Sequence, residues 1–268
     1  MEKEIIIKAE NVVKKFGSRT ILNGLSLEIC KGETFVIMGG SGCGKSTFLR
    51  HLIGALKPDS GKVYVLGQDI ASLNEDKLDA VKKKIGMCFQ SSALFDSMTV
   101  GDNVSLPLRE HTKLDKSVID IVVKMKLELV GLRGFEDLMP SQLSGGMRKR
   151  VGLARAIVMD PQIIFYDEPT AGLDPIVAAV IDRLIIDLSK KLSITSVVVT
   201  HDMKSVFSIA DRVAMLYEGR VLEVGRPEEI KKSKNAMVQQ FISGSYDGPI
   251  KFFQQKDDYL EQLMKNIL

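Results

Sequence analysis

The strongest chemical pattern in this sequence is a run of small residues that ends in a lysine and two hydroxyl side chains. It fits G-x-x-x-x-G-K-[ST], follows an apolar run at 34–38 and precedes a helical pattern at 48–56. Glycines let the backbone turn tightly and bring N–H groups close to a polyphosphate, and the start of the following helix favours the same negative charge. This context predicts a phosphate-binding loop rather than a glycine-rich turn before a helix. The loop consists of Gly39, Gly40, Ser41, Gly42, Cys43, Gly44, Lys45, Ser46 and Thr47.

Three side chains of this loop carry separate expectations. We expect Lys45 to reach the β- and γ-phosphates of a nucleotide and the Ser46 hydroxyl to bind Mg²⁺. Cys43 lies where a helix is about to begin, and the pKa of a thiol tends to fall there. Cys43 is either an alkylation-sensitive thiol or a small residue tolerated at a variable loop position, and the second interpretation is favoured.

A pair of acidic residues forms the second candidate site. Asp167 and Glu168 directly follow an apolar strand pattern at 163–166, and open α/β sheets bind their ligands at the carboxyl ends of strands. We expect Asp167 to hold Mg²⁺ and its waters, and Glu168 to orient or deprotonate the attacking water. Adjacent carboxylates at a strand end could instead cap a helix, but the phosphate-binding loop favours the catalytic interpretation.

Two further features have both a functional and a structural interpretation. The segment LSGGM precedes a basic helical pattern, so Ser144, Gly145 and Gly146 form either a second anion-binding helix start or a cap on a helix with a solvated charged face. Phe16 directly precedes a turn. It could be a core residue or a platform on which adenine stacks, and the phosphate-binding loop downstream favours stacking.

These residues need an α/β framework to position them. Strand patterns alternate with helical patterns, which predicts an α/β fold with a mainly parallel sheet, preceded by an N-terminal antiparallel β subdomain. From about 91 to 160 the pattern changes to helices separated by polar loops, where Thr99 and Asp102 look like a capping box. We expect strands at 5–16, 21–29, 34–38, 62–66, 85–89, 163–166, 196–200, 212–217 and 220–224, and helices at 48–56, 74–84, 115–130, 175–192 and 202–209.

Bulk properties exclude several classes of protein. The 268 residues include 37 basic and 34 acidic side chains, and the net charge of +3 is too small to indicate binding to nucleic acid or to an acidic membrane. Three cysteines without metal-ligand spacing fit a reducing compartment. We expect neither a signal peptide nor a membrane-spanning segment, so attachment to a membrane would need another protein.

Together with Gln90, Asp174 and His201, these motifs resemble the ATP-binding cassette (ABC) ATPases, in the family's order and over residues 5 to about 230. The resemblance implies a P-loop NTPase fold at 1–244, in which a helical subdomain at about 91–160 is inserted in a RecA-like core. It implies ATP and Mg²⁺ as cofactors, and a head-to-tail homodimer that encloses two ATP molecules. ATP would close this dimer and hydrolysis would release it.

The resemblance also implies roles within one subunit. Phe16 is the aromatic side chain that stacks on adenine, Gln90 is the lid glutamine that senses Mg²⁺ and the partner, and His201 is the switch histidine. The expected catalytic residues are Lys45, Gln90, Glu168 and His201. The expected metal-binding residues are Ser46, Gln90 and Asp167.

Other implied roles act between subunits. Ser144 and Gly146, with Gly145 between them, would contact the γ-phosphate of the ATP that is bound to the other subunit. Asp174 would belong to a loop that contacts the partner across the dimer. Because all these positions carry the residue type that the family uses, we expect an active ATPase.

Several stretches outside the shared motifs resemble the Mla-type phospholipid-transport ATPases, namely 91–95, 103–104 with 107–112, 125–128 with 130–134, 138–140 and 247–249. This narrower resemblance implies an integral membrane permease and an MCE-domain lipid-binding protein as partners. It implies a peripheral location on the cytoplasmic face of the bacterial inner membrane, and it leaves open a small accessory regulator. Many of these stretches lie in the helical segment at about 91–160, called the helical block below, where the permease docks in the family.

Two other functions remain as alternatives. The first is an ABC importer for another cargo, such as an amino acid or a metal. The second is a soluble ABC protein that acts as a switch on nucleic acid or a ribosome. The single motif set, the small net charge and the absence of a long coiled-coil insertion count against the second alternative.

The extension at 245–268 predicts a linker followed by an amphipathic helix from Lys256 onward. An isolated helix this short does not persist in water, so its apolar side needs a surface. Packing on its own subunit and packing on the neighbouring subunit are both open, and the narrower resemblance favours the neighbour. The apolar side consists of Tyr259, Leu260, Leu263, Met264, Ile267 and Leu268.

Overall fold

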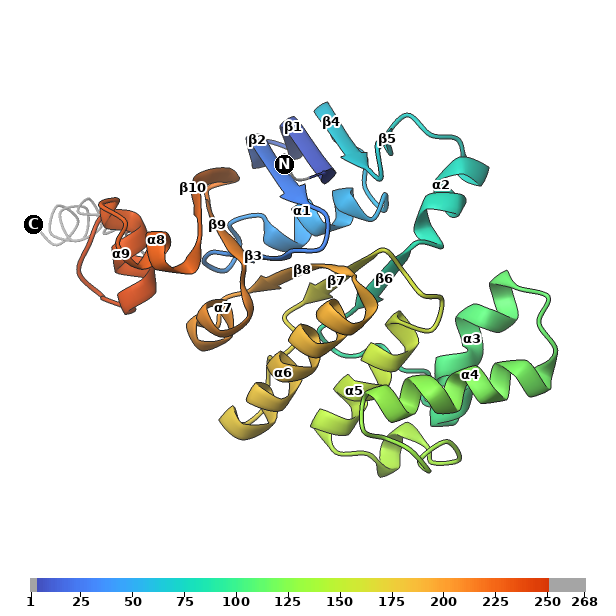
Figure 1. Ribbon diagram of the computed structural model, residues 1–268. Coiled ribbons are helices and arrows are strands. Elements are labelled where there is room, and N and C mark those ends of the chain that lie inside the picture. Colours follow the sequence, from blue (N-terminus) through green and yellow to red (C-terminus); the bar gives the residue numbers. More distant parts are fainter. Residues whose placement is uncertain (1–3, 251–268) are drawn as a thin grey trace, which may run out of the picture.

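In the computed structural model, which describes residues 4–250, the strands form two sheets that pack against each other (Figure 1). The strands are β1 (Ile5–Phe16), β2 (Arg19–Cys30), β3 (Thr34–Met38), β4 (Ser60–Val65), β5 (Gln68–Asp69), β6 (Ile85–Cys88), β7 (Ile163–Asp167), β8 (Thr195–Thr200), β9 (Arg212–Tyr217) and β10 (Arg220–Gly225). The helices are α1 (Lys45–Leu52), α2 (Glu75–Lys82), α3 (Val100–His111), α4 (Lys116–Leu129), α5 (Gly145–Ala156), α6 (Pro175–Leu192), α7 (Met203–Ile209), α8 (Pro227–Lys231), α9 (Ala236–Ser243) and the 3₁₀ helix η1 (Pro140–Gln142).

The larger sheet decides where the candidate residues meet. Its strand order is β10-β9-β3-β8-β7-β6, and all neighbouring pairs are parallel except β9 with the edge strand β10. In the register, Met38 pairs with Thr200, Asp167 with Val199 and Cys88 with Tyr166. The carboxyl ends of β3, β8, β7 and β6 therefore lie side by side, where an open parallel sheet binds its ligands.

The smaller sheet, in the order β2-β1-β4-β5, is antiparallel and confirms the predicted N-terminal β subdomain. In β2, Leu25, Leu27 and Ile29 are buried and alternate with exposed residues, the pattern of a sheet with one wet face. This face packs with α1 against the larger sheet and forms one of two apolar cores.

Both faces of the larger sheet are covered. In β3, Phe35 and Ile37 belong to the core between the sheets, whereas Val36 and Met38 belong to a second core with α5, α6 and the helical block. Such a strand is apolar throughout because neither face meets water. The confirmed fold is thus a mainly parallel α/β architecture.

Helices α3, α4, η1 and α5 lie between β6 and β7 in the sequence and form a group on one side of the sheet (Figure 1). Thr99 caps α3: its Oγ1 accepts a hydrogen bond from the N–H of Asp102 at 3.1 Å, which is the N-cap half of the expected capping box. The carboxylate of Asp102 accepts from Oγ1 of Thr99 at 3.0 Å rather than from its main-chain N–H, so the second half of the box is not formed. The helix expected at 115–130 is confirmed as α4.

The structure differs from the sequence prediction at some helix boundaries. Helix α1 begins at Lys45, three residues earlier than expected, because Gly44 at φ +110° closes the loop directly onto the helix. Helices α8 and α9 are not among the helices expected from the sequence, and they are anchored by the buried Ile230 and Val238. The predicted amphipathic helix from Lys256 lies outside the described residues. Within the described part, no helix is long and apolar enough to cross a bilayer.

Candidate functional site

The loop between β3 and α1 requires glycine at defined places. Gly39 has φ +154°, and a Cβ there would lie 2.3 Å from the carbonyl oxygen of Leu216 and 2.8 Å from Sγ of Cys43. At Gly44 a Cβ would lie 2.9 Å from Cδ2 of Leu22. Larger residues would therefore push the loop away from β9 and β2, so the glycine spacing seen in the sequence is a packing requirement as well as a turn signal.

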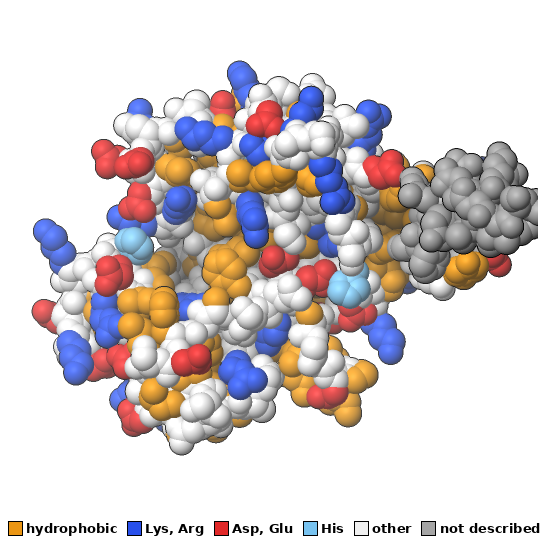
Figure 2. Space-filling view, turned by 180° about the vertical axis from the view of Figure 1, so that it is seen from behind, with side chains coloured by type: hydrophobic (Ala, Val, Ile, Leu, Met, Phe, Trp, Pro, Cys, Tyr) orange, Lys and Arg blue, Asp and Glu red, His pale blue; other side chains and the backbone are white. Residues whose placement is uncertain are grey.

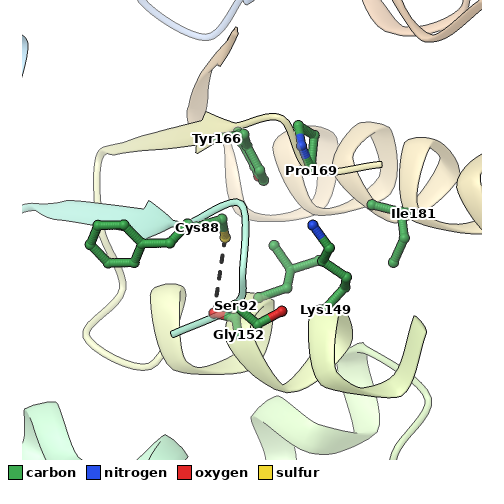
Figure 3. Close-up of a pocket in the computed structure, with 9 residues that line it drawn as sticks. Cys88, Ser92, Lys149, Gly152, Tyr166, Pro169 and Ile181 are labelled. Atoms are coloured by element: carbon green, nitrogen blue, oxygen red, sulfur yellow. Dashed lines mark hydrogen bonds between the residues drawn. The ribbon is translucent and has the colours of Figure 1, made fainter. Parts of the chain in front are cut away.

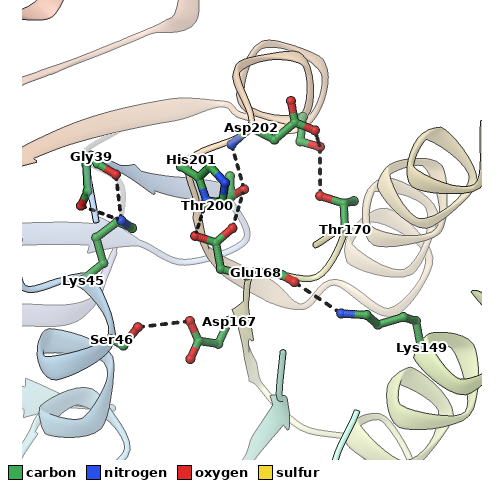
Figure 4. Close-up of polar contacts among 12 residues, drawn as sticks. Gly39, Lys45, Ser46, Lys149, Asp167, Glu168, Thr170, Thr200, His201 and Asp202 are labelled. Carbon is green, nitrogen blue, oxygen red and sulfur yellow. Dashed lines mark hydrogen bonds and ion pairs between the residues drawn. The ribbon is translucent and has the colours of Figure 1, made fainter. Parts of the chain in front are cut away.

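Lys45 lies inside this loop and is only 8% exposed. Its Nζ donates hydrogen bonds to the carbonyl oxygens of Gly39 at 2.7 Å and Gly40 at 3.0 Å (Figure 4). Among residues 4–250 no side chain caps the start of α1, whose N-cap residue is Gly44. The first N–H groups of α1 and the ammonium of Lys45 thus form one concentration of positive charge, which suits a phosphate group.

Ser46 and Asp167 come together from positions 121 residues apart. The Oγ of Ser46 donates to Oδ1 of Asp167 at 3.3 Å. Burial raises the pKa of Asp167, and the neighbouring carboxylate of Glu168 also raises it, while Ser46 and Lys45 act in the opposite direction. A cation beside Asp167 would offset this penalty on its charged form.

This pair fits Mg²⁺. Within residues 4–250 no group of three or more His, Cys, Asp or Glu side chains is arranged to hold a metal. Mg²⁺ is typically bound by one or two protein oxygens together with phosphates and waters, rather than by a complete protein cage. The hydroxyl of Ser46, next to the phosphate-binding loop, and the carboxylate of Asp167, at the end of β7, form such an incomplete site, which phosphates and waters would complete.

Glu168 is held firmly. Its Oε2 accepts from Oγ1 of Thr200 at 3.1 Å and its Oε1 accepts from Nδ1 of His201 at 2.8 Å (Figure 4). Its φ of +49° lies in the left-handed region, which is unfavourable for a residue with a Cβ and is found at functional sites. The side chain of Glu168 is mostly buried whereas that of His201 is 63% exposed, so the histidine forms the outer edge of the site.

Gln90 follows β6, beside Asp167 and Glu168 at the end of β7, and is exposed. Its carbonyl oxygen accepts a hydrogen bond from Lys149. Among the residues that the structure describes, no hydrogen bond joins the Gln90 side chain to Ser46 or Asp167. The structure therefore brings together Lys45, Ser46, Asp167, Glu168 and His201, and it places Gln90 next to them.

The second glycine-rich start, at α5, is built differently. Ser144 is its N-cap, and its Oγ accepts from the N–H of Met147 at 3.2 Å. Ser144 is exposed, but Gly146 is buried: a Cβ there would lie 2.5 Å from Cγ1 of Val177 on α6. Asp174 caps α6 by accepting from the N–H groups of Ile176 and Val177, both at 3.0 Å. The Ser144 start and the Asp174 loop are thus neighbours.

Phe16 is not a core residue. Its side chain is 52% exposed at the end of β1, and the ammonium of Lys14 lies 5.7 Å from the ring centroid. The ring is accessible for stacking, whereas adenine binding itself stays a prediction.

The expectation of a lowered pKa for Cys43 is wrong. The side chain is buried beneath the loop, and this burial raises the pKa of the thiol more than the nearby Lys45 lowers it. A thiolate buried at this position loses its solvation, and this effect on the pKa outweighs the opposite effect of the helix N-terminus. The structure favours the second interpretation, a small residue that fits the loop.

Two residues at the site were missed from the sequence. Thr200 donates to Glu168, and its place at a strand end directly before His201 was an available signal. Lys149 donates to the carbonyl oxygens of Gln90 and Glu168, and burial lowers its pKa. Nothing in the run Arg148-Lys149-Arg150 distinguishes Lys149 from its neighbours. Because Lys149 and Arg150 are half-buried and bind main-chain oxygens, the interpretation as a solvated charged face does not hold for them.

Comparison with known proteins agrees with this geometry. The family model described as "ABC transporter" matches residues 22–171. The chain is 45% identical over 260 residues to the intermembrane phospholipid transport system ATP-binding protein MlaF of Haemophilus influenzae, which covers 97% of this chain and 98% of that protein. It is 43% identical to the protein of the same name from Escherichia coli K12, with 92% of each chain covered.

A third relative carries a different name. The probable ribonucleotide transport ATP-binding protein mkl of Mycobacterium leprae is 42% identical, with 95% of this chain and 73% of that protein covered.

Solved structures are similar as well. A dimeric ATP-binding cassette in a post-hydrolysis state, bound to ADP and Pi, superimposes with a TM-score of 0.76 at 34% identity, covering 82% of this chain and 98% of that one. The cbiO1 subunit of the ABC transporter complex cbiONQ from Clostridium perfringens superimposes with a TM-score of 0.80 at 30% identity, covering 98% of this chain and all of the other.

Proposed function

Because the chain belongs to the ABC transporter family and is an ATPase, we propose that it is the ATP-hydrolysing subunit of a phospholipid transporter. The observation that carries this proposal is the extent of the similarity to the phospholipid transport ATP-binding proteins. It covers 97% of this chain, far beyond residues 22–171 that match the family model. The similarity to these proteins therefore extends to segments outside the part of the chain that matches the family model.

The site supports a defined division of roles. Lys45 and the uncapped start of α1 bind the phosphates, and a Mg²⁺ ion held by Ser46 and Asp167 would neutralise their charge. Thr200 and His201 fix the carboxylate of Glu168. Each of its oxygens keeps a second lone pair, so Glu168 can still orient an attacking water and accept its proton.

We propose further that two copies act together. Ser144 is exposed at the start of α5, where a γ-phosphate bound to the other copy can approach, and Asp174 lies beside it on the same surface. A 34% identical cassette is dimeric in its ADP- and Pi-bound state, which supports the arrangement. ATP would favour the closed dimer through contacts that hydrolysis removes.

The proposed partners are an integral membrane permease and an MCE-type lipid-binding protein, and a small regulator is a further candidate. The proposed location of the ATPase is the cytoplasmic face of the inner membrane. Phe89 and Phe95, on either side of Gln90, are 43% and 50% exposed next to the helical block, which suits a permease contact. On the face shown in Figure 2, basic and acidic side chains are interspersed, in agreement with a protein partner rather than nucleic acid.

Substitution of the proposed base tests this mechanism. We expect Glu168→Gln to lower ATP hydrolysis by about 10²- to 10⁴-fold, since the amide cannot accept the proton, and to leave ATP bound. An ATP-bound dimer should accumulate, as measured by size-exclusion chromatography with light scattering. Lys45→Ala, which should not retain ATP, is the control and should stay monomeric. Near-parental turnover of Glu168→Gln would assign the base elsewhere, and a monomeric ATP-bound form would exclude the proposed dimer.

The cargo needs a separate test. A ribonucleotide is the second candidate, because the 42% identical mycobacterial relative is named for its transport. An amino acid or a metal, the cargoes left open by the sequence, are further outcomes. Mass spectrometry of molecules that copurify with the intact membrane complex should find phospholipid; a water-soluble cargo alone would contradict the lipid proposal.

A further inference from the structure

Helix α5 presents one face to the segment that follows β6. Lys149, Gly152 and Arg155 share this face because they are three residues apart. The carbonyl oxygen of Gly152 accepts a weak hydrogen bond from Sγ of Cys88 at 3.9 Å (Figure 3). A Cβ on Gly152 would lie 3.4 Å from Cβ of Ser92. The helix is thus in direct contact with residues 88–93, which include Gln90.

Two cations on this face bind main-chain oxygens of the site. The Nζ of Lys149 donates to the carbonyl oxygen of Gln90 at 2.5 Å. It also donates to the carbonyl oxygen of Glu168 at 3.3 Å (Figure 4). The guanidinium of Arg155 donates to the carbonyl oxygens of Ser92 at 2.7 Å and Ala93 at 2.8 Å. Lys149 is therefore the side chain that joins the segment after β6 to the segment after β7.

Three of the four carbonyl groups that these cations bind belong to strained backbone. Glu168, Ser92 and Ala93 have φ values of +49°, +64° and +45°, in the left-handed region that side chains with a Cβ rarely adopt. Hydrogen bonds from a charged donor are among the stronger ones. The contacts from α5 therefore help to hold conformations that the local sequence does not favour.

The position of Lys149 is itself informative. Its side chain is half-buried in a pocket formed with Cys88, Tyr166 and Pro169, and this burial disfavours the charged form (Figure 3). A cation in such a place is stable when carbonyl oxygens replace its water, and Gln90 and Glu168 supply two of them. A lysine that served only for solubility would point to solvent instead.

Given the roles proposed above for Gln90 and Glu168, on which this inference rests, we infer that Lys149 is a positioning residue for ATP hydrolysis. Lys149 fixes the position of the Glu168 main chain through its carbonyl oxygen, while Thr200 and His201 fix the position of the Glu168 carboxylate. The same ammonium ties Gln90 to α5, the helix that begins at Ser144. A displacement of α5 with the helical block is thereby transmitted to both residues.

The test is Lys149→Met in the full-length chain, which keeps the apolar stem and removes the ammonium. We expect kcat to fall roughly 10- to 100-fold, as when a supporting hydrogen bond to an active residue is lost. The KM for ATP should change less than about 2-fold, because Lys149 does not contact the phosphate-binding loop. Lys149→Arg, which keeps the charge and the donors, should restore kcat to within a few-fold of the parent.

The matched control is Arg150→Met, one residue further along α5. Arg150 also donates to two carbonyl oxygens, those of Val130 at 3.3 Å and Gly131 at 3.2 Å, but both lie away from the site. We expect its kcat to remain near the parental value. The Tm of every variant should be measured alongside, so that loss of folded protein is separated from loss of kcat.

Three results would overturn the inference: a parental kcat in Lys149→Met, equal losses in Lys149→Met and Arg150→Met, or a kcat that Lys149→Arg fails to restore although the protein is folded. Glu168→Gln in the same assay separates this inference from the proposed function. If Glu168→Gln is inactive and Lys149→Met is normal, only the role of Lys149 fails. If Glu168→Gln is fully active, the proposed base fails first, whatever Lys149→Met does.

Discussion

Helices α1 and α5 both begin in glycine-rich sequence, but their N-termini differ in which groups are free to bind a phosphate. At α1 the N-cap is Gly44, no side chain from the described part of the chain caps the helix, and the buried Lys45 adds its charge. At α5 the exposed Ser144 already caps the helix through the N–H of Met147. The first start therefore offers several unpaired N–H groups to a phosphate, whereas the second offers an outward-facing hydroxyl.

The glycines of the two starts also serve different contacts. Gly39 and Gly44 permit backbone conformations and close approaches that form the loop itself. Gly146 permits α5 to pack on Val177 of α6. This difference fits the proposal that the first start binds a phosphate within one chain, whereas the second contacts a phosphate bound to another copy. The predictions below test that contrast.

The largest effect is expected at the first start. Lys45→Ala removes the ammonium from the loop, so ATP affinity should fall at least about 10-fold and turnover by about 10³-fold. Nucleotide titration and phosphate release measure the two quantities. Lys31→Ala, which changes an exposed lysine paired with Glu4, is the control and should behave as the parent. A fully active Lys45→Ala would remove the basis for the phosphate-binding assignment.

At the second start the effect should be smaller and confined to turnover. Ser144→Arg places a large side chain where the partner's γ-phosphate is proposed to lie, so hydrolysis should fall about 10²-fold while ATP binding to the monomer is retained. Asn74→Arg controls for the lost cap, since Asn74 caps α2 through the N–H of Lys77 without lying at the site. Equal activity of both variants would mean that Ser144 contacts no phosphate.

Stability should distinguish the adjacent glycines of α5. Gly146→Ala brings a Cβ to 2.5 Å from the stiff side chain of Val177 and should lower the free energy of unfolding by about 1–3 kcal/mol. At Gly145 the nearest atom would be at 3.5 Å, an ordinary contact, so Gly145→Ala should be neutral or gain up to about 1 kcal/mol of helix propensity. Urea denaturation measures both. If the two variants unfold alike, Gly146 is not required by packing against α6.

The smallest effect is expected at Asp182, a buried residue of α6. Asp182 is buried, its Oδ2 accepts from Ser205, and its Oδ1 has no partner among the described residues. Burial raises the pKa of Asp182 in the folded chain, so the folded state binds more protons than the unfolded one above roughly pH 4. Stability should therefore fall as pH rises through the folded pKa.

Asp182→Asn removes this penalty and should raise the free energy of unfolding at neutral pH, with no gain near pH 4. Denaturation curves at the two pH values measure it. Asp120→Asn, at an exposed position of α4, should show no such pH-dependent difference. A gain for Asp182→Asn that is equal at both pH values would exclude ionisation as its cause.

Much of the fold could be predicted because its signals are local. Phe35 and Ile37 alternate with Val36 and Met38 within one apolar strand, and the Thr99 cap marks the start of α3. The pKa of Cys43 could not be predicted in this way, because the helix start is a local feature whereas burial comes from residues distant in sequence. Lys149 was missed for the same reason: its partners, Gln90 and Glu168, are 59 and 19 residues away.

By itself the sequence determined the parts: a loop that can bind phosphate, two carboxylates at a strand end and a capped glycine-rich helix start. Their residue types and spacings require only local backbone geometry. The strand order β3-β8-β7-β6 decided that Ser46 meets Asp167, that Thr200 and His201 hold Glu168, and that Gln90 lies alongside. Tertiary structure decided these contacts because they depend on which strands pair and on which side chains lose water, and neither is encoded in any short segment.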